Sequence, residues 1–194
     1  MSNPLLDRTA LPQFSAIKPE HVVPAIDQLL DRNRQKIAQC VAQPMLDWQS
    51  LVGELEQIND ELAQAWSPVS HLNAVANNDE IREAYNACLP KLSEYFTELG
   101  QNPALFKAYE QFSQSEAYDA LSDAQKKVIT NALRDFRLAG IGLPEADQKR
   151  YAELQMKLSE LTTKFSENVL DATQGWNGLA AAPTELAGLP DHVL

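Results

Sequence analysis

Histidine is the side chain that proteins use most often to bind metal ions, and the sequence contains three of them: His21, His71 and His192. No two lie four residues apart, so the H-E-x-x-H pattern that places two histidines around zinc on one helix face is absent. The two cysteines, Cys40 and Cys88, do not have zinc-motif spacing either. Glycine-rich phosphate loops and the G-x-S-x-G turn of serine hydrolases are also absent. We therefore predict no metal ligand and no catalytic residue in this chain, and assign no residue to substrate binding.

Two of the histidines have a structural interpretation as well as a chemical one. His71 follows Ser70 in a polar stretch close to Asn73, and in that position it could line a cleft. A histidine that caps or packs at the end of a kinked helix is the more common case, and we favour it. His21 follows Glu20 in the first turn of a predicted helix, where we expect it to be exposed or to form a local hydrogen bond.

Two glutamates share one face of a predicted helix. Glu153 and Glu160 are each followed four residues later by a lysine, Lys157 and Lys164. Such pairs stabilise a helix by roughly 0.2–0.5 kcal/mol each. This pattern favours a solvated, ion-paired face over acid–base catalysis.

The cysteines lie in apolar helical patterns, Cys40 between Ile37 and Val41, and Cys88 beside Leu89. We interpret both as packed thiols rather than as a disulfide or a metal-binding pair.

The overall charge and hydropathy exclude several classes of protein. The 194 residues carry a formal net charge of −11, which argues against a nucleic-acid partner because such partners require a basic face. No apolar run approaches 18 residues, and the N-terminus has neither the basic start nor the apolar core of a signal peptide. We therefore expect a soluble cytoplasmic protein with no membrane partner.

The fold class follows from the spacing of apolar residues, which recur every three or four positions through most of the chain. This spacing predicts an all-α protein, a multi-helix antiparallel bundle. We divide it into an extended N-terminal arm over residues 1–17, a helical domain over 18–173, and the start of a further module over 174–194. Pro24, Pro68 and Pro90 fall within helical patterns, where we expect them to kink or end the helices.

The clearest structural signal spans residues 132–173 and predicts two helices joined by a tight corner. Gly140 suits the left-handed position of a Schellman ending, in which Ile141 meets Phe136, and Pro144 suits the first position of the next helix. That helix then carries a seam of residues three and four apart: Tyr151, Leu154, Leu158, Leu161, Phe165 and Asn168. The seam predicts an antiparallel helix pair. Its one polar member, Asn168, is either a buried residue that fixes register or the end of the packed stretch, and we favour the second.

Five segments of the chain resemble, in the same order, the N-terminal region of the thimet oligopeptidase and neurolysin family of zinc metallopeptidases. They are LPQFSAIKPEHVVPAI at 11–26, SPVSHLN at 67–73, ALRDFRLAGIGLP at 132–144, LSELTTKFSENVLDAT at 158–173 and ELAGLP at 185–190. The resemblance covers nearly the whole chain.

This resemblance implies a neurolysin-like zincin in which two helical halves enclose a deep channel that admits short unstructured peptides. One zinc ion lies on the channel floor, held by the two histidines of H-E-x-x-H and a downstream glutamate, and the motif glutamate activates the zinc-bound water. In such enzymes these residues lie far beyond position 194. The chain would then be the non-catalytic N-terminal domain, forming one wall of the channel and holding no cofactor itself.

The implied partners are the missing catalytic half of the same polypeptide and, for the full-length enzyme, short peptides. Exposed wall surface could also drive self-association. We expect Gly175–Leu194 to belong to the next module, to be poorly anchored, and to leave Trp176, Leu179 and Leu189 exposed.

The alternative is a free-standing helical interaction module without enzymatic activity. The two hypotheses differ at the C-terminus, since a complete module should end in a cap or a polar tail. This sequence ends in an apolar segment interrupted by Pro190, which favours the first hypothesis.

Overall fold

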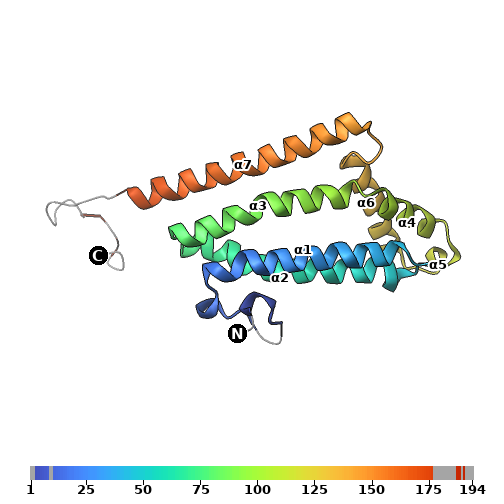
Figure 1. The fold of residues 1–194 in the computed structure, drawn as a ribbon, viewed down its shortest axis with the longest axis horizontal. Coiled ribbons are helices and arrows are strands. Elements are labelled where there is room, and N and C mark those ends of the chain that lie inside the picture. Colours follow the sequence, from blue (N-terminus) through green and yellow to red (C-terminus); the bar gives the residue numbers. More distant parts are fainter. Residues whose placement is uncertain (1–2, 9–10, 177–186, 189, 191–194) are drawn as a thin grey trace. The chain divides into compact units, whose positions relative to one another are not determined.

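The computed structural model describes residues 3–8, 11–176, 187–188 and 190. Within these residues it contains seven α-helices and no β-strand, so the predicted all-α class is confirmed (Figure 1). Contacts divide the chain into two compact units, Met1–Glu160 and Leu161–Leu194, called unit 1 and unit 2 below. The boundaries expected from the sequence at residues 17 and 173 remain predictions.

Unit 1 is built on three long helices that pack together: α1 (Pro19–Val41), α2 (Glu54–Val75) and α3 (Asp79–Gly100). Each buries one apolar face, and the fully buried core residues of these helices include Val22, Ile26, Val69 and Cys88. The shorter helices α4 (Pro103–Ser113), α5 (Glu116–Asp119) and α6 (Asp123–Leu138) lie near the end of α1, on the right in Figure 1.

The three internal prolines do not end their helices. Pro24, Pro68 and Pro90 lie inside α1, α2 and α3, so the expectation that they end the helices is wrong, while the expected kinks remain predictions. A proline removes one backbone donor and crowds the preceding turn, and burial of the remaining helix face compensates for that cost. Pro68 is itself buried in the core side of α2.

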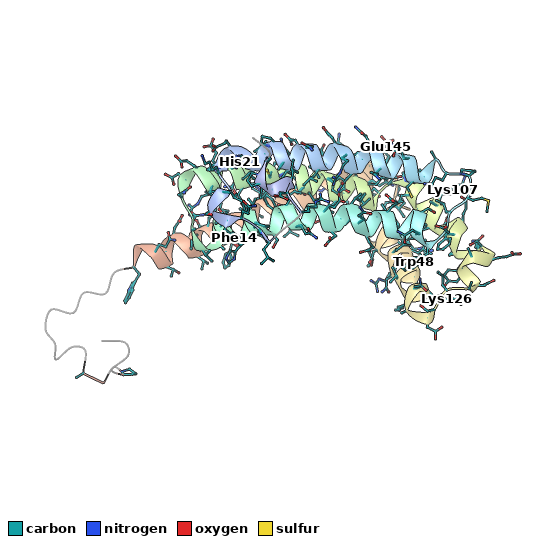
Figure 2. The ribbon with its side chains drawn as sticks, turned by 90° about the horizontal axis from the view of Figure 1, so that it is seen from below. Phe14, His21, Trp48, Lys107, Lys126 and Glu145 are labelled. Carbon is teal, nitrogen blue, oxygen red and sulfur yellow. The ribbon has the colours of Figure 1, made fainter. Side chains whose placement is uncertain are left out.

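A π-helical segment, Gln49–Gly53, leads directly into α2. Asp47 caps this start, because its carboxylate accepts the Ser50 N–H at 2.7 Å while the Asp47 N–H donates to the Ser50 hydroxyl at 2.9 Å. The Ser50 bonds lower the pKa of the Asp47 carboxyl. Figure 2 shows Trp48 at this start, near the end of α1, while Phe14 and His21 lie at the other end.

The corner after α6 is the Schellman ending predicted from the sequence. Gly140 has φ of +89°, the Ile141 N–H donates to the Phe136 carbonyl at 3.1 Å, and the Gly140 N–H donates to that of Arg137 at 3.1 Å. The last helix, α7 (Glu145–Gly175), begins one residue after Pro144, so Pro144 precedes the helix rather than opening it.

The predicted seam on α7 is not a buried one. No described residue of α7 is buried, and Leu154, Leu158, Leu161 and Phe165 are 52%, 56%, 52% and 70% exposed. The expected packed helix pair is therefore wrong for this helix, because spacing shows which residues share a face but not what covers it. Asn168 is exposed as well, so its amide is not a buried group that fixes the helix register in this structure.

The described part of unit 2 consists of residues 161–175 of α7, Trp176 and the short stretch at 187–188 and 190. Trp176 is 77% exposed, as expected. The predictions for Leu179, Leu189 and His192 concern residues outside the described part of the chain.

Candidate functional site

The N-terminal arm folds against α1 and α2, and a pocket lies between the arm and α2. The arm forms two short 3-10 turns, Pro4–Leu6 and Phe14–Ala16, so it is less extended than predicted. Leu5 and Ile17 are buried against the helices, and the Asn3 amide donates to the His21 carbonyl at 2.7 Å. The prediction that apolar arm residues lie on the helical body is confirmed for these two side chains.

A partly buried carboxylate ties the arm to the helices. Glu61 on α2 is 15% exposed and pairs with Arg8 of the arm at 2.6 Å and with Arg32 of α1. Gln57 donates to the same carboxylate at 3.1 Å. Burial alone raises the pKa of Glu61, but the Arg8 and Gln57 bonds and the charge of Arg32 outweigh it, so the pKa lies below its usual value.

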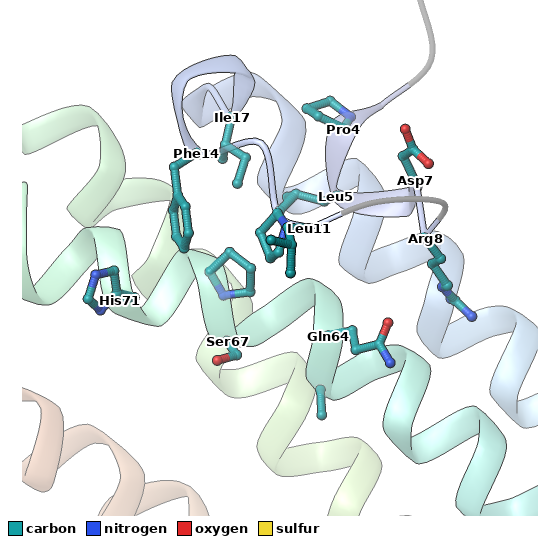
Figure 3. Close-up of a pocket in the computed structure, with 13 residues that line it drawn as sticks. Pro4, Leu5, Asp7, Arg8, Leu11, Phe14, Ile17, Gln64, Ser67 and His71 are labelled. Carbon is teal, nitrogen blue, oxygen red and sulfur yellow. The ribbon is translucent and has the colours of Figure 1, made fainter.

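The pocket has a volume of about 770 Å³, within the range of small-ligand sites, and opens between the arm and one face of α2 (Figure 3). Its walls are mainly apolar, with Leu11 at 88% exposed and Phe14 at 42% exposed. Five polar or charged side chains line the rest: Asp7, Arg8, Gln64, Ser67 and His71. Such a lining fits an apolar group held by a few polar contacts.

His71 combines both interpretations drawn from the sequence. Its ring packs edge-on against Phe14, with centroids 5.6 Å apart, so it has the packing role that we favoured. It also lines the pocket, as the other hypothesis required. It lies within α2 rather than at a helix end, because α2 continues to Val75.

The pocket does not contain a paired nucleophile and base among the described residues. Ser67 and His71 are one helical turn apart on α2, but no hydrogen bond joins them in the described structure. His21 is engaged elsewhere, accepting the Lys18 N–H at Nδ1 at 3.1 Å, which confirms the expected local bond. The arrangement can therefore bind an apolar group but shows no means of activating a nucleophile.

A second hollow, of about 570 Å³, lies in unit 1 between α3 and the first turns of α7. It contains the two glutamates considered from the sequence. Glu153 pairs with Arg150 at 3.1 Å and Glu160 with Lys157 at 2.8 Å. Both pairs span three residues within one exposed helix face, which agrees with the predicted solvated role, although the partners are Arg150 and Lys157 instead of the expected Lys157 and Lys164.

The thiols are buried and free, as predicted. Cys40 is 3% exposed and donates to the Ser50 carbonyl at 3.0 Å, and Cys88 is 0% exposed. Burial raises the pKa of Cys40, and raises that of Cys88 to about 11. A thiol in this state is a poor nucleophile and a poor metal ligand.

No group of three or more His, Cys, Asp or Glu side chains in the described structure is arranged to hold a metal ion. None of its helices is both long enough and apolar enough to span a membrane.

Comparison with known proteins identifies the family. The family model described as Neurolysin/Thimet oligopeptidase, N-terminal domain, matches residues 26–150. The chain belongs to this family. The neurolysin-like resemblance inferred from the sequence is thereby confirmed, and the helical body built on α1, α2 and α3 lies largely within the matched range.

Three relatives show how far the similarity extends. Oligopeptidase A of Haemophilus influenzae is 52% identical over 194 residues, covering all of this chain and 28% of the relative. Oligopeptidase A of Escherichia coli is 49% identical over 195 residues, covering all of this chain and 29% of the relative. The probable cytosolic oligopeptidase A of Arabidopsis thaliana is 32% identical over 193 residues, covering all of this chain and 28% of the relative. The chain thus spans less than a third of the length of these neurolysin-family relatives.

Proposed function

We propose that the chain is the non-catalytic N-terminal domain of a cytoplasmic zinc oligopeptidase, a peptide-bond hydrolase acting on short unstructured peptides. In this proposal it forms one wall of the substrate channel. The observation that carries the proposal is the 52% identity to Oligopeptidase A across the whole chain, together with coverage of only 28% of that relative. The partners are then the remaining part of the same polypeptide and the peptide substrates.

The residues that the structure describes do not fit a zinc site. His21 caps α1 and His71 packs against Phe14, and the described residues offer no cluster of metal ligands. The zinc ion and the groups that activate water therefore belong, in this proposal, to the part of the polypeptide beyond these residues. The contribution of this domain is a stiff helical surface, because α1, α2 and α3 share one close-packed core.

The test compares two lengths of polypeptide, these 194 residues and the full-length product of the same gene. Each is dialysed, its zinc content is measured, and it is incubated with a short fluorogenic peptide. The same sequence held inside a folded protein is the control for size selection. We expect about one zinc per chain and chelator-sensitive cleavage of the free peptide from the full-length protein only. Zinc binding with cleavage by the 194 residues alone would contradict the proposal.

One observation also supports the alternative, a free-standing helical interaction module. The exposed apolar residues of α7 would suit an interaction with another protein. The coding sequence after Leu194 separates the two functions: an H-E-x-x-H motif further along supports the peptidase, and an immediate stop codon supports the module.

A further inference from the structure

The longest helix of the chain has an apolar face that the described structure leaves open. α7 has 31 residues and none of those described is buried, whereas α1 buries eight of its 23 residues. A row of five large apolar side chains runs along α7 with spacings of four, three, four and four residues. We call this row the α7 stripe; it consists of Leu154, Leu158, Leu161, Phe165 and Val169, which are 51–70% exposed. At about 100° per residue, these side chains share one face of the helix.

The two sides of the α7 stripe differ in charge. On one side lie alternating basic and acidic residues that pair within the helix, Arg150 with Glu153 at 3.1 Å and Lys157 with Glu160 at 2.8 Å. We call this side the charged flank; it continues through Lys164 and Glu167. Paired surface charges of this kind belong at the wet rim of an interface.

The other side, the uncharged flank, contains only small or neutral residues: Ala152, Gln155, Ser159, Thr162 and Ser166. The Ser166 hydroxyl donates to the Thr162 carbonyl at 3.0 Å, so this polar group is already satisfied within the helix. Burying such a flank costs little, and small side chains allow another backbone to approach closely. Together, the α7 stripe and the uncharged flank form a broad face suited to a packed helix.

We infer that this face is covered by an apolar helical segment from the remainder of the same polypeptide, which packs over the α7 stripe and the uncharged flank. The inference rests on the proposed function, that these residues begin a longer oligopeptidase. The N-terminal-domain model ends at residue 150, immediately before this face begins. Oligopeptidase A of Haemophilus influenzae nevertheless remains similar along the whole chain, which makes up only 28% of its length.

A second copy of the chain fits the face less well. Two α7 helices that met antiparallel through the stripe would bring their charged flanks face to face. The flank residues nearest to the partner helix would then be Arg150, Lys157 and Lys164 on both helices. Facing rows of like charge repel each other. A segment that covers the uncharged flank and leaves the charged flank in water avoids this repulsion.

Thiol labelling tests the inference with three single substitutions around one point of the helix. Phe165→Cys lies in the stripe, Ser166→Cys in the uncharged flank and Lys164→Cys in the charged flank. Ser166→Cys is nearly isosteric, so its labelling rate still measures whether the face is covered even if Phe165→Cys weakens folding. Each is made in the 194-residue chain and in the full-length polypeptide, and the rate of reaction with a water-soluble maleimide is measured. The native thiols, Cys40 and Cys88, are buried and give little background.

In the 194-residue chain we expect all three introduced thiols to react at rates within about fivefold of one another, because the three parent residues are exposed. In the full-length polypeptide we expect Phe165→Cys to slow by about 100-fold and Ser166→Cys by about tenfold, with Lys164→Cys unchanged. Equal rates at all three positions in both lengths would overturn the inference. Protection that disappears on dilution would also overturn it and would assign the face to a second copy.

The peptidase assay separates failure of this inference from failure of the proposed function. If the full-length polypeptide cleaves peptides but Phe165→Cys reacts rapidly in it, the proposed function stands and the inference about the α7 stripe is wrong. If the full-length polypeptide protects Phe165→Cys but neither binds zinc nor cleaves peptides, the proposed function is wrong and the contact between α7 and the remaining polypeptide stands.

Discussion

At the scale of single residues, one buried amide determines how the three long helices meet. Asn33 of α1 is fully buried, and its side-chain N–H donates to the Ile58 carbonyl of α2 at 3.1 Å. Its amide nitrogen also lies 3.4 Å from the Tyr95 hydroxyl of α3. An apolar residue could fill the same space but could not distinguish one register of the helices from another. The amide nitrogen therefore links the three long helices of unit 1, while Asn33 Oδ1 is buried without a hydrogen-bond partner in the described structure.

Replacing this amide with a carboxylate should be severely destabilising. In Asn33→Asp the negative charge would face the Ile58 carbonyl oxygen in the core, and we expect a loss of about 3 kcal/mol in the free energy of unfolding at pH 7. Burial would raise the pKa of the new carboxyl, so the folded state would hold its proton more tightly, and the loss should shrink as the pH falls. Urea denaturation at pH 7 and pH 5 measures this. Asn168→Asp, at an exposed position, is the control, and a similar loss in both variants would contradict the argument.

The corner at Gly140 depends on a backbone conformation that glycine alone adopts easily. Gly140→Ala should reduce the free energy of unfolding by about 1–2 kcal/mol, because φ there is +89° and a Cβ would also lie 2.9 Å from Leu143 Cδ1. Gly142→Ala is the matched control in the same turn, since a Cβ there meets no atom within 4 Å. Urea denaturation should therefore distinguish the two alanine variants, and equal effects would argue against a backbone cause.

The Glu61 carboxylate should give the arm a stability that depends on pH. Its pKa is lower in the folded than in the unfolded state, so its contribution is present above the usual carboxyl pKa and is lost as the pH falls through the folded value. Glu61→Gln should cost about 1 kcal/mol at pH 7 and less at pH 3. Urea denaturation of wild type, Glu61→Gln and the surface control Glu83→Gln at both pH values measures this. A cost that stays constant with pH would show that the charge does not matter.

At the scale of elements, local hydrogen bonds mark where two of the helices begin. α3 starts at an asparagine cap, where the Asn78 side-chain oxygen accepts the Ile81 N–H at 2.8 Å. α6 starts at a capping box, in which the Ser122 N–H donates to the Gln125 side chain at 3.1 Å. These local bonds satisfy backbone donors at helix starts and involve residues only three positions apart.

Removing the α3 cap tests this explanation. Asn78→Ala should lower the free energy of unfolding by about 1 kcal/mol, because the Ile81 N–H loses its acceptor. Asn78→Asp keeps an acceptor and adds a favourable charge at the helix start, so it should be close to wild type. Thermal and urea denaturation of the two variants give the comparison. An alanine variant as stable as the aspartate variant would show that the cap contributes nothing.

The contrast between α1 and α7 also belongs to this scale. Both have apolar residues three and four positions apart, yet α1 is covered along its face and α7 is not. The periodic pattern alone therefore describes a helix that is able to pack, and the packing itself depends on the neighbouring elements.

At the scale of the whole molecule, the two native thiols report on the cohesion of unit 1. Cys40 and Cys88 both belong to the one core cluster formed by α1, α2, α3 and α4. We expect neither to react with a thiol reagent in the native 194-residue chain, and both to react together as urea unfolds it, because a cooperative core opens as a unit. The fully denatured chain is the control for reactivity. Rapid labelling of one thiol without urea would indicate that part of the core opens independently.

The sequence by itself determined the helical class, the Schellman corner at Gly140, the packed thiols and the neurolysin-like family. These features depend on interactions between residues close in sequence, or on patterns of residue type, so they can be read along the chain.

Only the tertiary structure decided which apolar faces are covered, that Pro24, Pro68 and Pro90 stay within continuous helices, and that the arm and α2 form a pocket beside His71. It also brought Arg8, Arg32 and Glu61 together from three separate elements. Each of these features depends on contacts between residues far apart in sequence. The energies of these contacts offset local free-energy costs, such as that of a proline within a helix, and a sequence pattern does not show them.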